Sequence, residues 1–222
     1  MNANELHPNK NLKNICYIKN VVQNPNIQIG DFTYYNCEKG VENFEVTKIS
    51  SEKRMVILIM GASHTGKTTL AKKLLEKYKY PYFSIDHLKM GLIRSGLAQL
   101  TPTDDEKLTE FLWPILREMK KNVIENEQNL IVEGCYIPWN WTSDFAPKYR
   151  QHIQSYCLIM SENYIRNHFD DIQKYAKTEK RLHDDCSQEN LWKENKHSLE
   201  KAQKFHLNSI FIDKKYEVSI EL

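Results

Sequence analysis

Short apolar runs alternate with longer amphipathic stretches from residue 55 to the end of the chain. The runs have the length and β-branched content of buried strands, and the stretches between them repeat apolar positions at helical spacing. This alternation predicts a parallel sheet covered by helices on both faces, an α/β fold. The predicted strands lie at 55–60, 82–85, 130–133, 156–160 and 210–212, and the predicted helices at about 67–78, 87–96, 104–127, 162–176 and 187–204.

The first 50 residues show little helical periodicity and are expected to form a small β-rich extension. Residues 27–35 are rich in β-branched and aromatic side chains and precede a turn-rich segment at 36–40, which predicts a strand and then a turn. A segment of this size buries little core alone. We therefore divide the chain into residues 1–50 and 51–222, and expect the extension to pack on the larger domain or to mediate self-association.

Composition and charge exclude several classes of protein. The 31 Lys and Arg residues against 29 Asp and Glu leave a net charge of +2, which argues against general nucleic-acid binding. The apolar run at 55–60 is far shorter than the roughly 20 residues that span a bilayer, and no secretory signal is visible at the N-terminus. Five scattered cysteines without a CxxC pair fit reduced thiols. We expect a cytoplasmic protein with no membrane or nucleic-acid partner.

The segment Gly61-Ala-Ser-His-Thr-Gly-Lys-Thr68 matches the pattern G-x-x-x-x-G-K-[ST], with an apolar strand before it and a helix after it. Glycines let the backbone curl so that several N–H groups converge on an anion, and the helix N-terminus adds partial positive charge. We expect Lys67 to reach the β- and γ-phosphates of ATP or GTP, and Thr68 to ligate Mg²⁺. The residues expected to contact the nucleotide are Gly61, Ala62, Ser63, His64, Thr65, Gly66, Lys67, Thr68 and Thr69.

Two acids end neighbouring predicted strands. Asp86 follows the second strand and should face the phosphates, because the carboxyl ends of parallel strands line the ligand crevice. There it could accept a proton from an attacking hydroxyl or help to hold Mg²⁺ through water; the alternative is a cap on the following helix. Glu133 closes the third strand, where it either orients Mg²⁺-bound water or pairs with a basic neighbour.

Further candidates would bind the acceptor of a phosphoryl group. Tyr136, Trp139 and Trp141 would line the crevice as an aromatic wall, or pack as core beneath a loop. Arg94 lies about two helical turns after Asp86 and would clamp a charged group on the acceptor, or remain a surface arginine. The residues predicted to bind the acceptor are Asp86, Arg94, Glu133 and Tyr136.

Residues 55–213 resemble the small P-loop kinases that include adenylate kinase, shikimate kinase, chloramphenicol phosphotransferase and the zeta toxins. The resemblance lies in the loop, in Asp86 after the second strand, in the third strand at 129–134 and in a basic segment after the fourth strand. It implies a three-layer P-loop NTPase fold with a five-stranded parallel sheet in the order 2-3-1-4-5. It also implies that Asp86 is the catalytic base, as an aspartate at that place is in chloramphenicol phosphotransferase and the zeta toxins.

The same resemblance implies a mobile helical lid at about 166–186. Lids of this kind close over the nucleotide and bring cations onto the transferring phosphoryl group. Arg166 and Arg181 are the candidates for that catalytic role, alongside Lys67 and Asp86. A solvated helical surface is the alternative for the charges of this segment.

Residues 11–45 resemble the opening of the virginiamycin/streptogramin-type xenobiotic acetyltransferases, which are left-handed β-helix enzymes. The hexapeptide coils, the catalytic histidine and the acetyl-CoA site of such enzymes are absent from this sequence. A lone coil has no neighbours to stack on. We therefore expect no acetyltransferase activity and interpret the segment as a fused remnant.

These features predict an ATP-dependent phosphotransferase that moves the γ-phosphate to a hydroxyl or phosphate of a small molecule. Two narrower alternatives stay open: a nucleoside or nucleotide kinase, and a toxin-like kinase of nucleotide sugars. From other classes, the chain could be a regulatory module that binds a nucleotide without transfer, or an assembly module built on residues 1–50.

Overall fold

The computed structural model of the chain describes residues 2–9, 11, 15–21, 29–36, 55–178 and 186–222. The chain divides into two compact units, Met1–Lys53 and Arg54–Leu222. In the smaller unit, β1 (Ile15–Tyr17) pairs antiparallel with β2 (Tyr34–Asn36), and the short 3₁₀ helix η1 (Ile18–Asn20) follows β1.

A strand was predicted at 27–35, and this prediction is wrong for residues 29–33. Strand β2 begins only at Tyr34, because residues 30–33 form a turn in which the Thr33 N–H donates to the Gly30 carbonyl at 3.2 Å. Residues 27 and 28, and the predicted turn at 37–40, lie outside the described residues. Gly-Asp is a frequent turn sequence, and here it overrides the β-branched composition around it.

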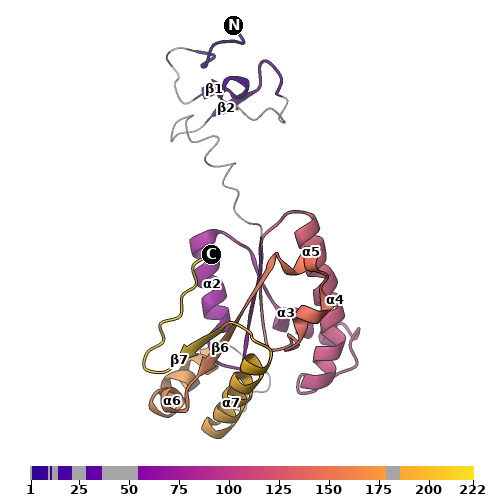
Figure 1. Cartoon of the computed structure of the whole chain (residues 1–222), viewed down its shortest axis with the longest axis vertical. Coiled ribbons are helices and arrows are strands. Elements are labelled where there is room, and N and C mark those ends of the chain that lie inside the picture. Colours follow the sequence, from indigo (N-terminus) through magenta and orange to yellow (C-terminus); the bar gives the residue numbers. More distant parts are fainter. Residues whose placement is uncertain (1, 10, 12–14, 22–28, 37–54, 179–185) are drawn as a thin grey trace. The chain divides into compact units, whose positions relative to one another are not determined.

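A five-stranded parallel sheet forms the centre of the larger unit (Figure 1). Its spatial order is β4 (Tyr82–Ser84), β5 (Leu130–Glu133), β3 (Val56–Gly61), β6 (Ile153–Met160) and β7 (Ser209–Ile212). Counted along this unit, the order is 2-3-1-4-5, as the resemblance to P-loop kinases implied. Strand β3 is central and every one of its residues is buried, which explains why it is apolar throughout.

Helices follow the strands closely at the predicted places. Helix α4 continues through Pro114, as the apolar spacing on both sides of that residue indicates. None of the helices in the part of the chain that the structure describes is long and apolar enough to cross a membrane. Their bounds are α2 (Lys67–Tyr78), α3 (Ile85–Arg94), α4 (Asp105–Glu125), α5 (Pro147–Arg150), α6 (Glu162–Thr178) and α7 (Gln188–Lys204), with a 3₁₀ helix η2 (Trp141–Asp144).

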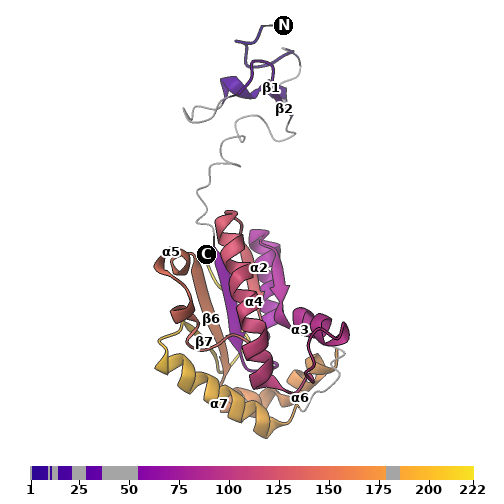
Figure 2. The ribbon, with the colours of Figure 1, turned by 90° about the vertical axis from the view of Figure 1, so that its right-hand side faces the viewer.

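Two apolar clusters lie on opposite faces of the sheet, so the unit has three layers. Successive side chains of β3 alternate between them. Ile57 and Ile59 pack in one cluster with α2, α6 and the C-terminal segment. Leu58 and its neighbours pack in the other with α3, α4 and the end of α7. Figure 1 shows α2 and α4 on opposite sides of the strands, and Figure 2 looks onto the face that α4 covers.

One charged residue, Lys120 of α4, is fully buried in the second cluster. Its ammonium lies 4.0 Å from the ring centroid of Trp113 and 5.8 Å from that of Phe145, and it has no hydrogen-bond partner among the described residues. Cation–π attraction replaces only part of the lost hydration. Burial lowers the pKa of Lys120 to about 7.

This burial predicts a pH dependence of stability. The pKa of an unfolded lysine is about 10.4, so between about pH 7 and 10 the unfolded chain binds a proton that the folded chain does not. The stability of the wild-type protein therefore rises with pH across this window. We expect Lys120→Met to be more stable than wild type at pH 7, by a few kcal/mol, and to lose most of that advantage by pH 10.

Urea denaturation at several pH values measures the effect. Lys121→Met is the matched control, because Lys121 is the next residue of α4 and pairs with Glu118 at 2.9 Å. The difference in stability between Lys121→Met and wild type should not shrink from pH 7 to pH 10. A constant difference between Lys120→Met and wild type from pH 7 to pH 10 would mean that the pKa of Lys120 is not lowered in the folded protein.

Candidate functional site

The loop between β3 and α2 turns on two glycines. Gly61, the last residue of β3, has φ +130°, and a Cβ there would lie 2.3 Å from the carbonyl oxygen of Leu158 in β6. Gly66 has φ +83° and is the N-cap residue of α2. Side chains other than hydrogen are strained at both positions. The chain therefore leaves the centre of the sheet in a tight curl that ends at the N-terminus of a helix.

The curl is held from within by side chains that bond to the Ala62 carbonyl. Thr65 is fully buried, and its hydroxyl donates to that oxygen at 2.9 Å. The ammonium of Lys67, which is also buried, donates to the same oxygen at 2.6 Å. With Lys67 folded over the loop, the loop holds its shape and keeps its cation at the place where an anion would bind.

An acidic side chain already contacts one amide of this loop. The N–H of Ser63 donates to the carboxylate of Glu194 in α7 at 3.3 Å. A loop of convergent amides next to a helix N-terminus attracts negative charge, and the contact to Glu194 is an instance of that preference within the chain itself.

A buried carboxylate lies beside the first turn of α2. Glu133, the last residue of β5, is 2% exposed and accepts a hydrogen bond from the Thr68 hydroxyl at 3.2 Å. Among the described residues it forms no ion pair. A buried carboxylate next to a hydroxyl, with its charge not balanced by a side chain, suits a divalent cation that brings phosphate and water as its other ligands. Thr68 and Glu133 therefore fit the Mg²⁺ that the sequence predicts.

Asp86 is joined to a chain of polar side chains. It lies in the first turn of α3, one residue beyond Ile85, and its carboxylate pairs with Lys89 at 2.9 Å. The Lys89 ammonium also donates to the hydroxyl of Tyr136 at 2.9 Å, and that hydroxyl donates to Asp105 at 3.0 Å. Ser84 occupies the N-cap position of α3, and Asp86 lies within the first turn of the helix.

Tyr136 is the buried centre of this network. Its side chain is 5% exposed, and the Lys89 ammonium lies 4.9 Å from the centroid of its ring. Burial, with added repulsion from Asp105, raises the pKa of Tyr136 far above its ordinary value. The phenol therefore stays protonated and links three elements: the loop after β5, α3 and the start of α4.

The loop and this network line one cavity of about 1300 Å³. It is bounded by the carboxyl ends of β3 and β4, by α3, by the start of α4, by the segment after β5 and by α7. Behind its wall, Lys67 and Glu133 are buried, and Thr69 lies exposed on α2. The predicted residues that line it are Gly61, Ala62, Ser63, His64, Thr68, Asp86, Arg94 and Tyr136.

The aromatic wall is only partly formed. Trp139 lines the cavity and packs edge-to-face on His197 of α7, with 6.3 Å between ring centroids. Trp141 is 3% exposed and packs on Phe145 in the second apolar cluster. For Trp141 the alternative of core packing is correct, because the 3₁₀ helix η2 turns it toward α4.

Arg166, the one predicted lid arginine that the structure describes, does not line the cavity. Arg166 lies on α6, its side chain is 69% exposed, and it pairs with Glu162 at 2.5 Å. It is absent from the cavity lining, because its place one turn after Glu162 directs it outward on the helix surface. Arg181 and the rest of 179–185 lie outside the described residues.

Sequence reasoning missed other residues that line the cavity. Lys89 could have been found, because a cation three residues after an acid at a helix start shares its face. The contribution of α7 had no such signal, since only the fold shows which side of that helix meets the loop. The missed charged residues are Lys72, Lys89, Asp105, Lys193 and Glu194.

Strand order and loop together define the class of the larger unit, an α/β domain with the P-loop fold. No family model matches the chain. An uncharacterized ATP-binding protein of Methanocaldococcus jannaschii is 25% identical over 162 residues, which are 67% of this chain and 41% of that protein. The chain thus spans about two fifths of the length of this curated relative.

Several solved structures are similar to the chain, among them the following three. A candidate kinase from Chloroflexus aurantiacus has a TM-score of 0.49 and 16% identity, over 77% of this chain and 93% of that chain. A gluconokinase from Sinorhizobium meliloti has a TM-score of 0.43 and 13% identity, over 72% of this chain and 82% of that chain. A shikimate kinase from Bacteroides thetaiotaomicron has a TM-score of 0.43 and 17% identity, over 74% of this chain and 89% of that chain. The class assignment rests on the strand order and the loop rather than on these similarities. The resemblance of residues 11–45 to acetyltransferases receives no support from the comparisons.

The close approach of Gly61 to β6 can be tested directly. In Gly61→Ala, the new Cβ would meet the Leu158 carbonyl at 2.3 Å, and backbone cannot move aside as a side chain could. We expect a loss of roughly 2–5 kcal/mol in the free energy of unfolding, measured by urea denaturation. In Gly91→Ala, on an open face of α3, nothing lies within 4 Å of the new Cβ, so stability should rise by about 0.5–1 kcal/mol. Equal stability of Gly61→Ala and wild type would contradict the geometry of the loop.

Proposed function

We propose that the chain is a Mg²⁺- and ATP-dependent phosphotransferase that acts on a hydroxyl group of a small molecule. The observation that carries the proposal is the cavity, in which Asp86 faces the same space as the phosphate-binding loop. The curated relative, which is named as an ATP-binding protein, supports the nucleotide part. The acceptor would occupy the side of the cavity formed by α3, the start of α4 and Trp139.

Each group has a definite task in the proposed reaction. The loop amides hold the β- and γ-phosphates, and Lys67 exchanges the Ala62 carbonyl for phosphate oxygens. Asp86 accepts the proton of the acceptor hydroxyl as the new bond from oxygen to the γ-phosphorus forms and the bond to the bridging oxygen of ADP breaks. A Mg²⁺ ion held through Thr68 and Glu133 would neutralise charge on the phosphates.

Positive charge around the transferred group has several sources in the described residues. Lys72 and Lys193 line the cavity on the side of α2 and α7. Lys89 holds Asp86 in place, so that the carboxylate is aimed rather than free to rotate. Because positioning and charge neutralisation supply most of phosphoryl-transfer catalysis, this set is chemically sufficient.

Nucleotide binding is the first test. Wild-type protein titrated with MgATP in a calorimeter should show one site per chain, and Lys67→Met should weaken binding by roughly 10–100-fold, because a charge-assisted contact to phosphate is lost. Lys107→Met is a suitable control, since that side chain is 71% exposed on α4 and does not line the cavity. If the folded wild-type protein does not bind MgATP, the proposed phosphotransferase function is wrong.

Asp86 separates an enzyme from a module that only binds a nucleotide. We expect Asp86→Asn to retain MgATP affinity and to lower transfer of labelled γ-phosphate by roughly 10²–10⁴-fold, because the base is removed. Transfer is measured to water and to defined panels of nucleosides, sugars and antibiotics. The control is Asp171→Asn, an exposed aspartate near His168 at the same i,i+3 spacing. Unchanged transfer by Asp86→Asn would show that the residue is not the base.

A further inference from the structure

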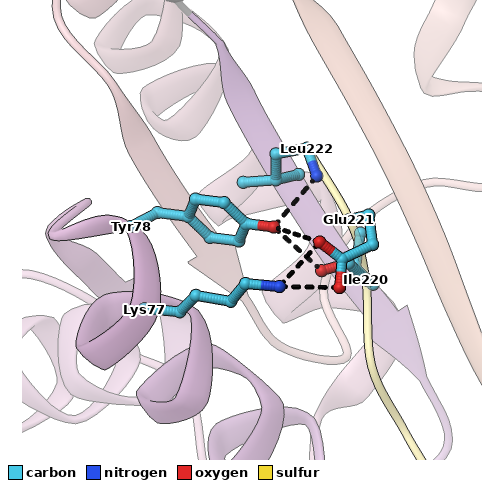
Figure 3. Close-up of polar contacts among 5 residues, drawn as sticks. All are labelled: Lys77, Tyr78, Ile220, Glu221 and Leu222. Carbon is cyan, nitrogen blue, oxygen red and sulfur yellow. Dashed lines mark hydrogen bonds and ion pairs between the residues drawn. The ribbon is translucent and has the colours of Figure 1, made fainter.

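The segment after β7 lies along α2 as an extended strap. At one end of α2, the Tyr216 hydroxyl contacts the phosphate-binding loop. Val218 and Ile220 are buried in the apolar cluster that α2 covers. At the other end, the segment is tied to the last turn of α2, through Tyr78 and its neighbour Lys77 (Figure 3).

The far anchor is a cluster of polar contacts. The Tyr78 hydroxyl donates to the Glu221 carboxylate at 3.1 Å and accepts from the Leu222 N–H at 3.2 Å. The Lys77 ammonium contacts both oxygens of Glu221 at 2.6 Å. Figure 3 shows these side chains converging between α2 and the strap. The strap is thus held at the C-terminal end of α2 independently of Tyr216.

Tyr216 meets the loop from behind, on the side of its carbonyl groups. Its hydroxyl donates to the Gly66 carbonyl at 3.1 Å, with the Thr65 carbonyl 3.4 Å away as a second acceptor. The Gly66 carbonyl also accepts the first-turn hydrogen bond from the Leu70 N–H at 3.0 Å. A Cβ at Gly66 would lie 1.9 Å from the Tyr216 oxygen, so the tyrosine fits only against glycine.

Because of peptide geometry, a contact to the carbonyl groups on one side of the loop also affects the N–H groups on the other side. In a trans peptide the C=O and the N–H that follows it point in opposite directions. The Thr65 carbonyl shares a peptide with the Gly66 N–H, and the Gly66 carbonyl shares one with the Lys67 N–H. The one hydroxyl proton of Tyr216, shared between the two carbonyls, therefore restrains the directions of both N–H groups. Glycine peptides rotate most freely, so the restraint has its largest effect here.

We propose that Tyr216 is a positioning residue that fixes the Gly66 and Lys67 amides in the orientation that binds nucleotide phosphates. The inference rests on the nucleotide binding of the proposed function. Burial raises the pKa of Tyr216 to about 12, so the phenol remains a donor at neutral pH. Pre-orienting the amides lowers the entropy lost when the phosphate binds.

The test uses two ligands, MgATP and magnesium tripolyphosphate, which has the phosphates without the nucleoside. Tyr216→Phe keeps the ring and removes the hydroxyl. We expect its dissociation constants for both ligands to rise by a similar factor, roughly 3–10-fold, which is the effect of one hydrogen bond. Amide hydrogen exchange without ligand should become faster at Gly66 and Lys67.

Tyr78→Phe is the matched control. It removes the same hydroxyl group from the other anchor of the same strap, away from the loop. It should lower the melting temperature and leave both dissociation constants within about twofold of wild type, since the hydrogen bonds that it removes, to Glu221 and Leu222, do not involve the loop. Circular dichroism confirms that both variants fold.

The outcomes separate the explanations. Unchanged affinity of Tyr216→Phe for both ligands overturns the inference and leaves the proposed function intact. If Tyr216→Phe loses affinity for MgATP but not for magnesium tripolyphosphate, Tyr216 contacts the nucleoside. If Tyr78→Phe loses as much affinity as Tyr216→Phe, the strap acts only through the stability of the fold. Either outcome overturns the inference. Failure of the wild-type protein to bind either ligand removes the proposed function and this inference together.

Discussion

The parallel hydrogen bonding of β3 between β5 and β6 is the constraint on which the rest of the structure depends. Register places Ile59 of β3 opposite Glu133 of β5, and Glu133 opposite Ser84 of β4. Three chain segments therefore leave the sheet at nearly the same level: the loop at 61–68, the segment that follows Glu133 and the start of α3 with Asp86. A shift of one residue in either pairing would turn the Glu133 side chain to the opposite face.

Charge in the cavity is balanced locally rather than overall. The chain carries a net charge of only +2, yet the proposed nucleotide site would place an anionic ligand near Asp86, Glu133 and Glu194. Lys89 neutralises Asp86 directly, and Glu133 is buried next to a hydroxyl, where a divalent cation would compensate it. Glu194 accepts from a loop amide, so a phosphate at that amide would have to replace it. Acids within a phosphate site are tolerable only with such partners.

Sequence reasoning predicted the sheet, its helices and the loop, because local patterns specify these features. An apolar run predicts a buried strand, and glycine spacing predicts the loop between Gly61 and Gly66. Strand order came from resemblance, since parallel pairing is not encoded locally. Contacts between distant elements were beyond prediction: Glu194 and Tyr216 lie more than a hundred residues from the loop that they touch. Arg166 was predicted to be catalytic because of the resemblance to the kinase lid, but its position around the axis of α6 leaves its side chain exposed.

The strap along α2 shows how such distant contacts complete a local motif. The loop sequence supplies amides and flexibility, but flexible amides bind an anion weakly because their ordering opposes binding. Tight curling at Gly66 requires φ +83°, a region that glycine enters without strain and also leaves easily. Rigidity must therefore come from side chains that hold the backbone of the loop in place. Thr65 and Lys67 restrain the loop from within through the Ala62 carbonyl, and Tyr216 restrains it from behind through the peptides on either side of Gly66. The glycine that permits the curl also leaves the space that the tyrosine fills, so loop and strap are complementary parts of the proposed anion site.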